Sequence, residues 1–145
     1  MEIYTIGFTK RSAEDFFESL SNWGIERLVD VRVSNNSQLA GFAKKLDLAY
    51  LLRELVGADY HHEPLLAPTK ALLKDYRTKQ LDWGQYEAAF VNLLSERKIE
   101  DEIPGDLFLP RTVLLCSEPT PAFCHRRLVV EYLNGSWGDV QAVDL

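Results

Sequence analysis

One short apolar run, Thr112-Val113-Leu114-Leu115-Cys116, constrains the fold of this chain more than any other part of its sequence. An apolar run without polar alternation indicates a strand that is covered on both faces, as in parallel sheets flanked by helices. The residues that follow, Ser117-Glu118-Pro119, predict a turn. Thr120 as N-cap and Pro121 as first helical residue then predict a helix that runs to about Leu133.

Other segments with the composition of strands alternate with helical ones along the whole chain. This alternation predicts a single three-layer α/β domain over residues 1–145, with a mainly parallel open sheet and helices on both faces. The other strands are predicted at Ile3–Ile6, Arg27–Arg32, Asp59–His62 and Val140–Leu145. The other helices are predicted between Ser12 and Gly24, over Leu46–Val56, from Thr69 to Tyr76 and over Asp82–Lys98, with a loop from Asp101 to Pro110.

Composition and charge exclude several classes of protein. The formal net charge is −6, so we expect no extended groove for nucleic acid, although a local basic pocket stays open. No apolar run approaches the roughly 20 residues of a membrane span, and no basic and apolar leader follows Met1. We therefore expect a cytoplasmic protein with no membrane contact, in which Cys116 and Cys124 are reduced.

Polar and reactive side chains lie where the predicted strands end. Because ligands bind beyond the carboxyl ends of parallel strands, we expect these residues to share one edge of the sheet. The first strand carries Thr5 and ends at Gly7 and Thr9, and the second ends at Asp30 and Arg32. The others end at His61 and His62 and at Cys116 and Glu118.

The last predicted helix adds a second group of reactive side chains to that edge. Projected at 100° per residue, His125 lies near the middle of the buried side, Cys124 and Arg126 lie on its flanks, and Arg127 faces solvent. A helix N-terminus favours anions and thiolates. The segment from Cys116 to Arg127 is therefore the predicted centre of activity.

Each of these residues also has a purely structural interpretation. His125 can be a core histidine bonded to backbone, and Cys116 and Cys124 can be small buried apolar residues. Arg126 can pair with Glu118, and Asp30 with Arg32 or Arg53, as scaffolding. The sequence leaves both interpretations open.

Well-known motifs are missing from the chain. It has no Gly-x-Gly-x-x-Gly and no Walker loop. Thiol phosphatases and sulfurtransferases place a cysteine where Cys116 stands, but their closing arginine is replaced by Ala122. Cys116, Cys124, His125 and His62 include enough ligand types for zinc. Adjacent ligands at Cys124 and His125 are poor geometry, however, so no metal site is predicted.

Four segments nevertheless occur in an order typical of one family. They are Tyr4-Thr5-Ile6-Gly7, Val29-Asp30-Val31-Arg32, Tyr60-His61-His62-Glu63-Pro64, and Leu114-Leu115-Cys116-Ser117-Glu118 followed by Cys124-His125-Arg126. The chain resembles the uncharacterised family called domain of unknown function 488 over nearly its whole length. Leu66-Ala67-Pro68-Thr69, with Trp83 and Tyr86, resembles one branch of it.

Two loops depart from the pattern of that family. Its first loop typically reads Gly-His-Ser, whereas this chain has Gly7-Phe8-Thr9. Its loop after the second strand is rich in arginine and proline, and here reads Val33-Ser34-Asn35-Asn36. The resemblance implies a fold and a site, and it brings no activity.

Three hypotheses follow for function, of which the third and least favoured is a metal or redox site. In the first, the chain is an enzyme for a small anionic ligand, such as a nucleotide or a nucleic-acid end. In the second, it is a non-catalytic ligand- or partner-binding module with a degenerate site. The sequence assigns no cofactor and no oligomeric state. The candidate catalytic residues are Cys124, His125 and Cys116, and the candidate ligand-binding residues are Arg126, Arg32, Glu118, Asp30, Thr5, Gly7, Thr9 and His62.

Overall fold

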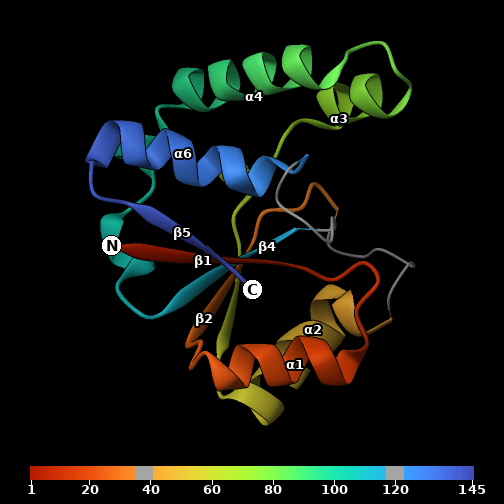
Figure 1. Ribbon diagram of the computed structural model, residues 1–145, viewed down its shortest axis with the longest axis vertical. Coiled ribbons are helices and arrows are strands. Elements are labelled where there is room, and N and C mark those ends of the chain that lie inside the picture. The colour runs from red at the N-terminus through yellow and green to blue at the C-terminus, as the bar shows by residue number, and fades with distance from the viewer. Residues whose placement is uncertain (35–40, 117–122) are drawn as a thin grey trace.

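Five parallel strands form one sheet in the spatial order β3-β2-β4-β1-β5 (Figure 1). The computed structural model describes residues 1–34, 41–116 and 123–145. The strand pairs are all parallel, which confirms the predicted sheet. The strands are β1 (Glu2–Gly7), β2 (Arg27–Asp30), β3 (Asp59–His62), β4 (Thr112–Cys116) and β5 (Gln141–Asp144).

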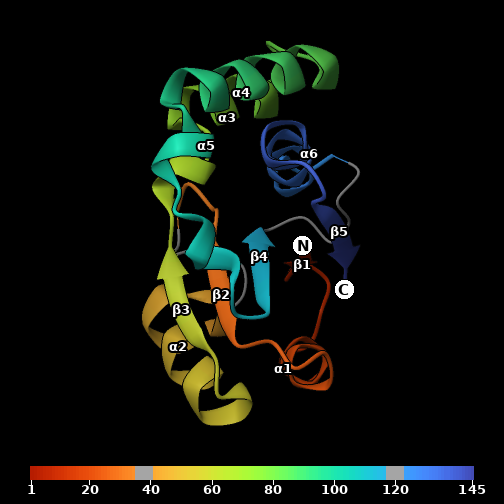
Figure 2. The same cartoon turned by 90° about the vertical axis from the view of Figure 1, so that its left-hand side faces the viewer.

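Helices cover both faces of the sheet, so the predicted three-layer α/β architecture is confirmed (Figures 1 and 2). One face carries α1 (Ala13–Asn22) and α2 (Lys45–Leu51), which continues as the π-helical turn η2 (Leu52–Val56). The other face carries α3 (Lys70–Arg77), α4 (Trp83–Arg97) and α6 (His125–Trp137). The shorter elements are η1 (Gly41–Ala43), η3 (Pro64–Leu66), α5 (Ile99–Glu102) and η4 (Gly105–Phe108).

Strand β4 lies at the centre of the sheet, and all five of its residues are buried. Successive side chains of a strand point to opposite faces. Val113 and Leu115 accordingly belong to the core beneath α1 and α2. Leu114 and Cys116 belong to the core beneath α4 and α6. The alternation therefore directs the sulfur of Cys116 toward the helix that follows β4 in the sequence.

The connections after β4 and after its neighbours run to opposite faces. After β1 and β2 the chain passes to α1 and α2, whereas the helix after β4 is α6 on the other face. Adjacent strands whose connections diverge leave a crevice at their carboxyl ends, which is where open α/β sheets bind ligands. Gly7 and Cys116 are register partners at this point.

Helix caps lie where the sequence predicts them. Ser12 accepts a hydrogen bond from the backbone N–H of Asp15, and Thr69 caps α3 in the same way. Asp82 and Gln85 form a reciprocal capping box at the start of α4. Gly57 ends the helical segment before β3 in the left-handed conformation.

The last helix differs from its prediction at both ends. Phe123 and Cys124 are not helical, so α6 begins at His125 and not at Pro121. Thr120 and Pro121 themselves lie outside the described residues. The helix continues past Leu133 and Gly135 to Trp137, because Gly138, at φ 73°, adopts the left-handed conformation that ends it.

Two other boundaries need smaller corrections. The predicted loop from Asp101 to Pro110 holds the end of α5 and the 3₁₀ turn η4. Strand β2 ends at Asp30, two residues before its predicted end. Within the described residues, no helix has both the length and the apolar character needed to cross a bilayer.

Replacing Leu114 by alanine tests the central position of β4. Leu114 is fully buried, so the change removes apolar contacts and leaves a cavity. We expect the free energy of unfolding to fall by about 2–5 kcal/mol, measured by urea denaturation. The matched control is Leu109→Ala, because Leu109 is 77% exposed, and there we expect a change within about 0.5 kcal/mol. Similar losses in both variants would contradict the buried position of β4.

Candidate functional site

A pocket of about 650 Å³ opens where β1, β2 and β4 end, at the carboxyl edge of the sheet. Its walls come from the ends of β1, β2 and β4, from α3 and α4, and from the start of α6. Its volume is in the range of ligand sites for small molecules. Of the candidate residues, the structure brings Thr9, Arg32, Cys116, Cys124 and His125 together in its lining.

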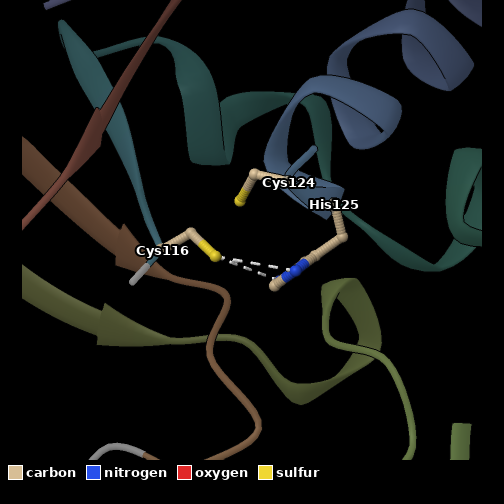
Figure 3. A group of neighbouring side chains, drawn as sticks. All are labelled: Cys116, Cys124 and His125. Carbon is tan, nitrogen blue, oxygen red and sulfur yellow. Dashed lines mark hydrogen bonds between the residues drawn. The ribbon is translucent and has the colours of Figure 1, made fainter. Parts of the chain in front are cut away.

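Cys116 and His125 are in contact in this lining (Figure 3). Sγ of Cys116 lies 3.6 Å from Nδ1 of His125, and Nε2 of His125 lies 2.6 Å from the carbonyl oxygen of Val31. Because a carbonyl only accepts, Nε2 carries the hydrogen of the neutral ring. Nδ1 is then free to accept the thiol proton, which is the nucleophile–base–orienter arrangement of thiol enzymes.

The protonation of His125 depends on its sulfur neighbour. Burial by itself lowers the pKa of His125. The charge of Cys116 and the hydrogen bonds to Cys116 and to the Val31 carbonyl outweigh burial, so the pKa of His125 lies above its ordinary value. The interaction is reciprocal, so protonated His125 favours the thiolate form of Cys116.

Cys124 has the opposite tendency. Burial raises the pKa of Cys124 well above that of an ordinary thiol, and the neighbouring Cys116 raises it further. The charge of Arg126 offsets only part of this rise. In the absence of any bound cation, Cys124 therefore stays a neutral thiol, and Cys116 is the sulfur that His125 can activate.

The charged side chains of the pocket are cationic. Among the described lining residues these are Arg32, Lys70, Lys74 and Arg77, and none of these lining residues is an aspartate or glutamate. Lys70, Lys74 and Arg77 are spaced i, i+4 and i+7 along α3, so they share one face of that helix. A cationic wall on a protein of net charge −6 favours an anionic ligand.

The side chain of Arg32 is held in place by the carboxylate of Asp30. Its Nε and Nη2 donate to the two carboxylate oxygens at 2.8 and 2.7 Å, and Nη2 also donates to the Ala43 carbonyl. The guanidinium carbon lies 5.3 Å from the centre of the Phe8 ring. Within the described part of the chain, Nη1 is buried and has no hydrogen-bond partner. Arg32 thus offers the pocket a fixed donor.

Aromatic rings form a further part of the wall. Tyr76 and Tyr86 have ring centres 4.8 Å apart, and Trp83 and Phe123 have ring centres 5.5 Å apart. Phe123 is 63% exposed although it lines the pocket. Burial raises the pKa of Tyr86, so its hydroxyl stays protonated. Flat apolar faces beside cationic groups suit a ligand that carries both a ring and a negative charge.

Comparison with known proteins gives a family and no function. The family model described as Domain of unknown function DUF488 matches residues 12–133. The chain belongs to this family. No curated protein and no solved structure matches the chain.

The other candidate residues that the structure describes are not part of the pocket lining. Thr5 donates a hydrogen bond to Asp144 on β5, and Asp30 is fully buried against Arg32 and Tyr60. Nε2 of His62 contacts the backbone oxygen of Arg32, and His62 does not line the pocket. Gly7 ends β1 without lining the pocket, and Glu118 lies outside the described residues.

The two arginines in the first turn of α6 lie outside the pocket lining. Arg126 is 1% exposed and does not line the pocket. Its positive charge lowers the pKa of both Cys124 and His125. Arg127 is partly exposed and pairs with Glu131 and Glu87 on the outer side. His125 is buried and Arg127 is partly exposed, but Arg126, predicted on the flank of the buried side, is more deeply buried than His125.

Sequence reasoning missed the contribution of α3 and α4. Lys70, Lys74 and Arg77 are not among the residues predicted to form the site, and Trp83 and Tyr86 enter the sequence argument only through the family resemblance. The i, i+4, i+7 spacing of the cations was a visible signal in an acidic chain. What the sequence could not show is that α3 lines the same pocket as the residues at the carboxyl ends of distant strands.

Removing the carboxylate of Asp30 tests how Arg32 is held. Asp30→Ala leaves the buried guanidinium charge without its ion-pair partner. We expect the free energy of unfolding at pH 7 to fall by about 3–5 kcal/mol, measured by urea denaturation. Glu54→Ala is the control, because it removes the exposed pair with Arg53 and should change stability very little. An equally small effect at Asp30 would show that the buried pair does not fix Arg32.

Proposed function

We propose that this chain is an enzyme that binds a small ring-bearing anion, such as a nucleotide or a nucleic-acid end, and attacks it with the sulfur of Cys116. The observation that carries the proposal is the 3.6 Å contact between Cys116 and His125 in the lining of a cationic pocket. A purely structural histidine is held by its hydrogen bond to backbone. The second ring nitrogen of His125 also contacts a thiol in a pocket, which is an arrangement typical of functional sites.

The side chains of the pocket divide the work in this proposal. The thiol proton of Cys116 passes to Nδ1 of His125, and the thiolate forms a bond to an electrophilic atom of the ligand as the bond from that atom to its leaving group breaks. Nδ1 of His125 returns the proton to the leaving group, and water then releases the bound ligand from the sulfur. The guanidinium of Arg32 and the cations of α3 hold the negative group, and the aromatic wall holds the ring. Tyr86 stays protonated and is a donor for a ligand oxygen.

A second candidate, a non-catalytic binding module, is favoured by Phe8. Relatives typically carry a histidine in the first loop, whereas here Phe8 is 1% exposed and its ring lies under Arg32. Phe8 can therefore hold Arg32 but cannot transfer a proton. A binding module would bind ligand without any need for Cys116, so measurements on that thiol separate the two candidates.

Alkylation of single-cysteine variants tests the nucleophile. Cys124→Ser keeps only Cys116, and Cys116→Ser keeps only Cys124, so each variant reports one thiol. Both variants are first treated with a chelator, which removes metal ions that could bind the thiols. We then expect iodoacetamide to modify Cys116 at least about tenfold faster than Cys124, because burial keeps Cys124 protonated. Mass spectrometry measures the rates, and equal labelling after unfolding in urea is the control.

The pH profile of the same reaction tests His125. The pKa of His125 lies above its ordinary value, so the imidazolium that supports the thiolate of Cys116 persists above about pH 6.5. His125→Gln keeps a donor for the Val31 carbonyl but removes this charge. We expect the variant to require higher pH for the same alkylation rate. A profile unchanged by His125→Gln, or equal rates for the two thiols, would favour the binding module.

Calorimetry with AMP, adenosine and inorganic phosphate tests the ligand class. If ring and charge both contribute, AMP binds more tightly than either of its parts. Replacing Lys74 and Arg77 together by alanine should weaken AMP binding at least about tenfold, because each charged hydrogen bond contributes about 1.5–3 kcal/mol. Arg53→Ala, a cation outside the pocket lining, is the control. Equal binding of adenosine and AMP would rule out an anion site.

A further inference from the structure

Three soft ligand atoms converge at the floor of the pocket. The sulfurs of Cys116 and Cys124 and a ring nitrogen of His125 all lie within 4.8 Å of one another, and the three residues are buried (Figure 3). They are the one such group of potential metal ligands among the described residues. Neither cysteine is in a disulfide.

The convergence depends on where α6 begins. Two adjacent residues within a helix point about 100° apart, which is why the sequence argued against Cys124 and His125 as joint ligands. In the structure Cys124 precedes the helix with extended backbone, at φ −132° and ψ 139°, and only His125 is helical. The side chains of these neighbours are therefore able to turn toward the same point, opposite Cys116 at the end of β4.

The spacing of the donor atoms of Cys116 and His125 suits a tetrahedral metal ion. Zinc lies about 2.3 Å from sulfur and about 2.0–2.1 Å from nitrogen, so two tetrahedral ligands of these types lie roughly 3.5 Å apart. Sγ of Cys116 and Nδ1 of His125 are 3.6 Å apart. Nε2 of His125 donates to the Val31 carbonyl, which is the outer hydrogen bond that orients metal-binding histidines.

We propose that Cys116, Cys124 and His125 form a three-ligand site for Zn²⁺, with the fourth position open to the pocket. Two sulfurs and one imidazole nitrogen, with no carboxylate among them, select zinc over magnesium or calcium. On binding, both thiols release their protons, and the two thiolates neutralise the charge of the ion. All three residues line the pocket, so water or the anionic ligand can occupy the remaining position.

This site does not require the proposed reaction. In the metal-bound form the sulfur of Cys116 is a ligand and is not available as a nucleophile. The metal-free form is the one in which His125 activates that sulfur. Zinc binding and alkylation of Cys116 therefore exclude each other, and each can be measured without the other.

Titration of the full, reduced and chelator-treated chain with Co²⁺ alone tests the site. We expect one Co²⁺ per chain, with the sulfur-to-cobalt charge-transfer band and the strong visible bands of a tetrahedral ion. Added Zn²⁺ should displace the cobalt with loss of both signals. Zn²⁺ should also slow iodoacetamide labelling of Cys116 in the unmutated chain by at least about tenfold, which needs no variant to fold.

Variants then assign the ligands. Cys124→Ser leaves Cys116 and His125 in place but should weaken Co²⁺ binding by at least about 100-fold and reduce the charge-transfer band. His61→Gln is the matched control, because His61 is partly exposed and pairs with Glu63 outside the pocket lining. It should leave cobalt binding unchanged, and circular dichroism checks that both variants are folded.

The outcomes separate this proposal from the proposed function. Absence of the charge-transfer band, binding unaffected by Cys124→Ser, or no protection of Cys116 by Zn²⁺ would each overturn the metal site. Faster alkylation of Cys116 in chelator-treated protein would still support the nucleophile in that case. If zinc binds and chelator-treated Cys116 shows no enhanced reactivity, the metal site stands and the proposed nucleophile fails.

Discussion

The central position of β4 is the constraint on which the rest of the structure depends. Because helices cover both faces of the sheet, every residue of β4 is buried, and alternate side chains enter different cores. A shift of one residue in the register of β4 would turn Cys116 toward α1 and away from α6. The apolar run that specifies the fold thus also sets the direction of the sulfur. Packing at the sheet centre thus fixes β4, and the reactive side chain of Cys116 stands at the end of that strand.

The pocket carries a charge opposite to that of the chain. The formal net charge is −6, yet the described charged residues of the lining are four cations. Arg32 is neutralised by Asp30, whereas Lys70, Lys74 and Arg77 are exposed. Exposed charges act over about 8 Å at physiological ionic strength, so salt weakens their attraction for an anion. Nη1 of Arg32 is buried, so salt would weaken a hydrogen bond from this atom to an anion less than it weakens the attraction of the exposed charges.

Most of the fold could be predicted from local sequence signals, because apolar runs, N-caps and terminating glycines act over a few residues. Thr112–Cys116, Ser12 and Gly57 all behave as their local sequence predicts. The start of α6 could not be predicted in this way. Thr120 and Pro121 are a strong local signal, but Phe123 and Cys124 are not helical. The spacing of the cations on α3 is visible in the sequence, but their place in the same pocket as the end of β4 is not, because the two segments are distant in sequence.

The extended backbone of Cys124, immediately before α6, brings its sulfur into the group formed with Cys116 and His125. If Cys124 were helical, its sulfur would point away from that of Cys116, and His125 would face one thiol. With Cys124 extended, two sulfurs and one imidazole surround a common point. The Val31 carbonyl fixes Nε2 as the protonated nitrogen, which leaves Nδ1 for either a proton or a metal ion. In the two proposed states Cys116 would be a metal ligand or a nucleophile but not both, and the hydrogen bond from Nε2 to the Val31 carbonyl is compatible with either state.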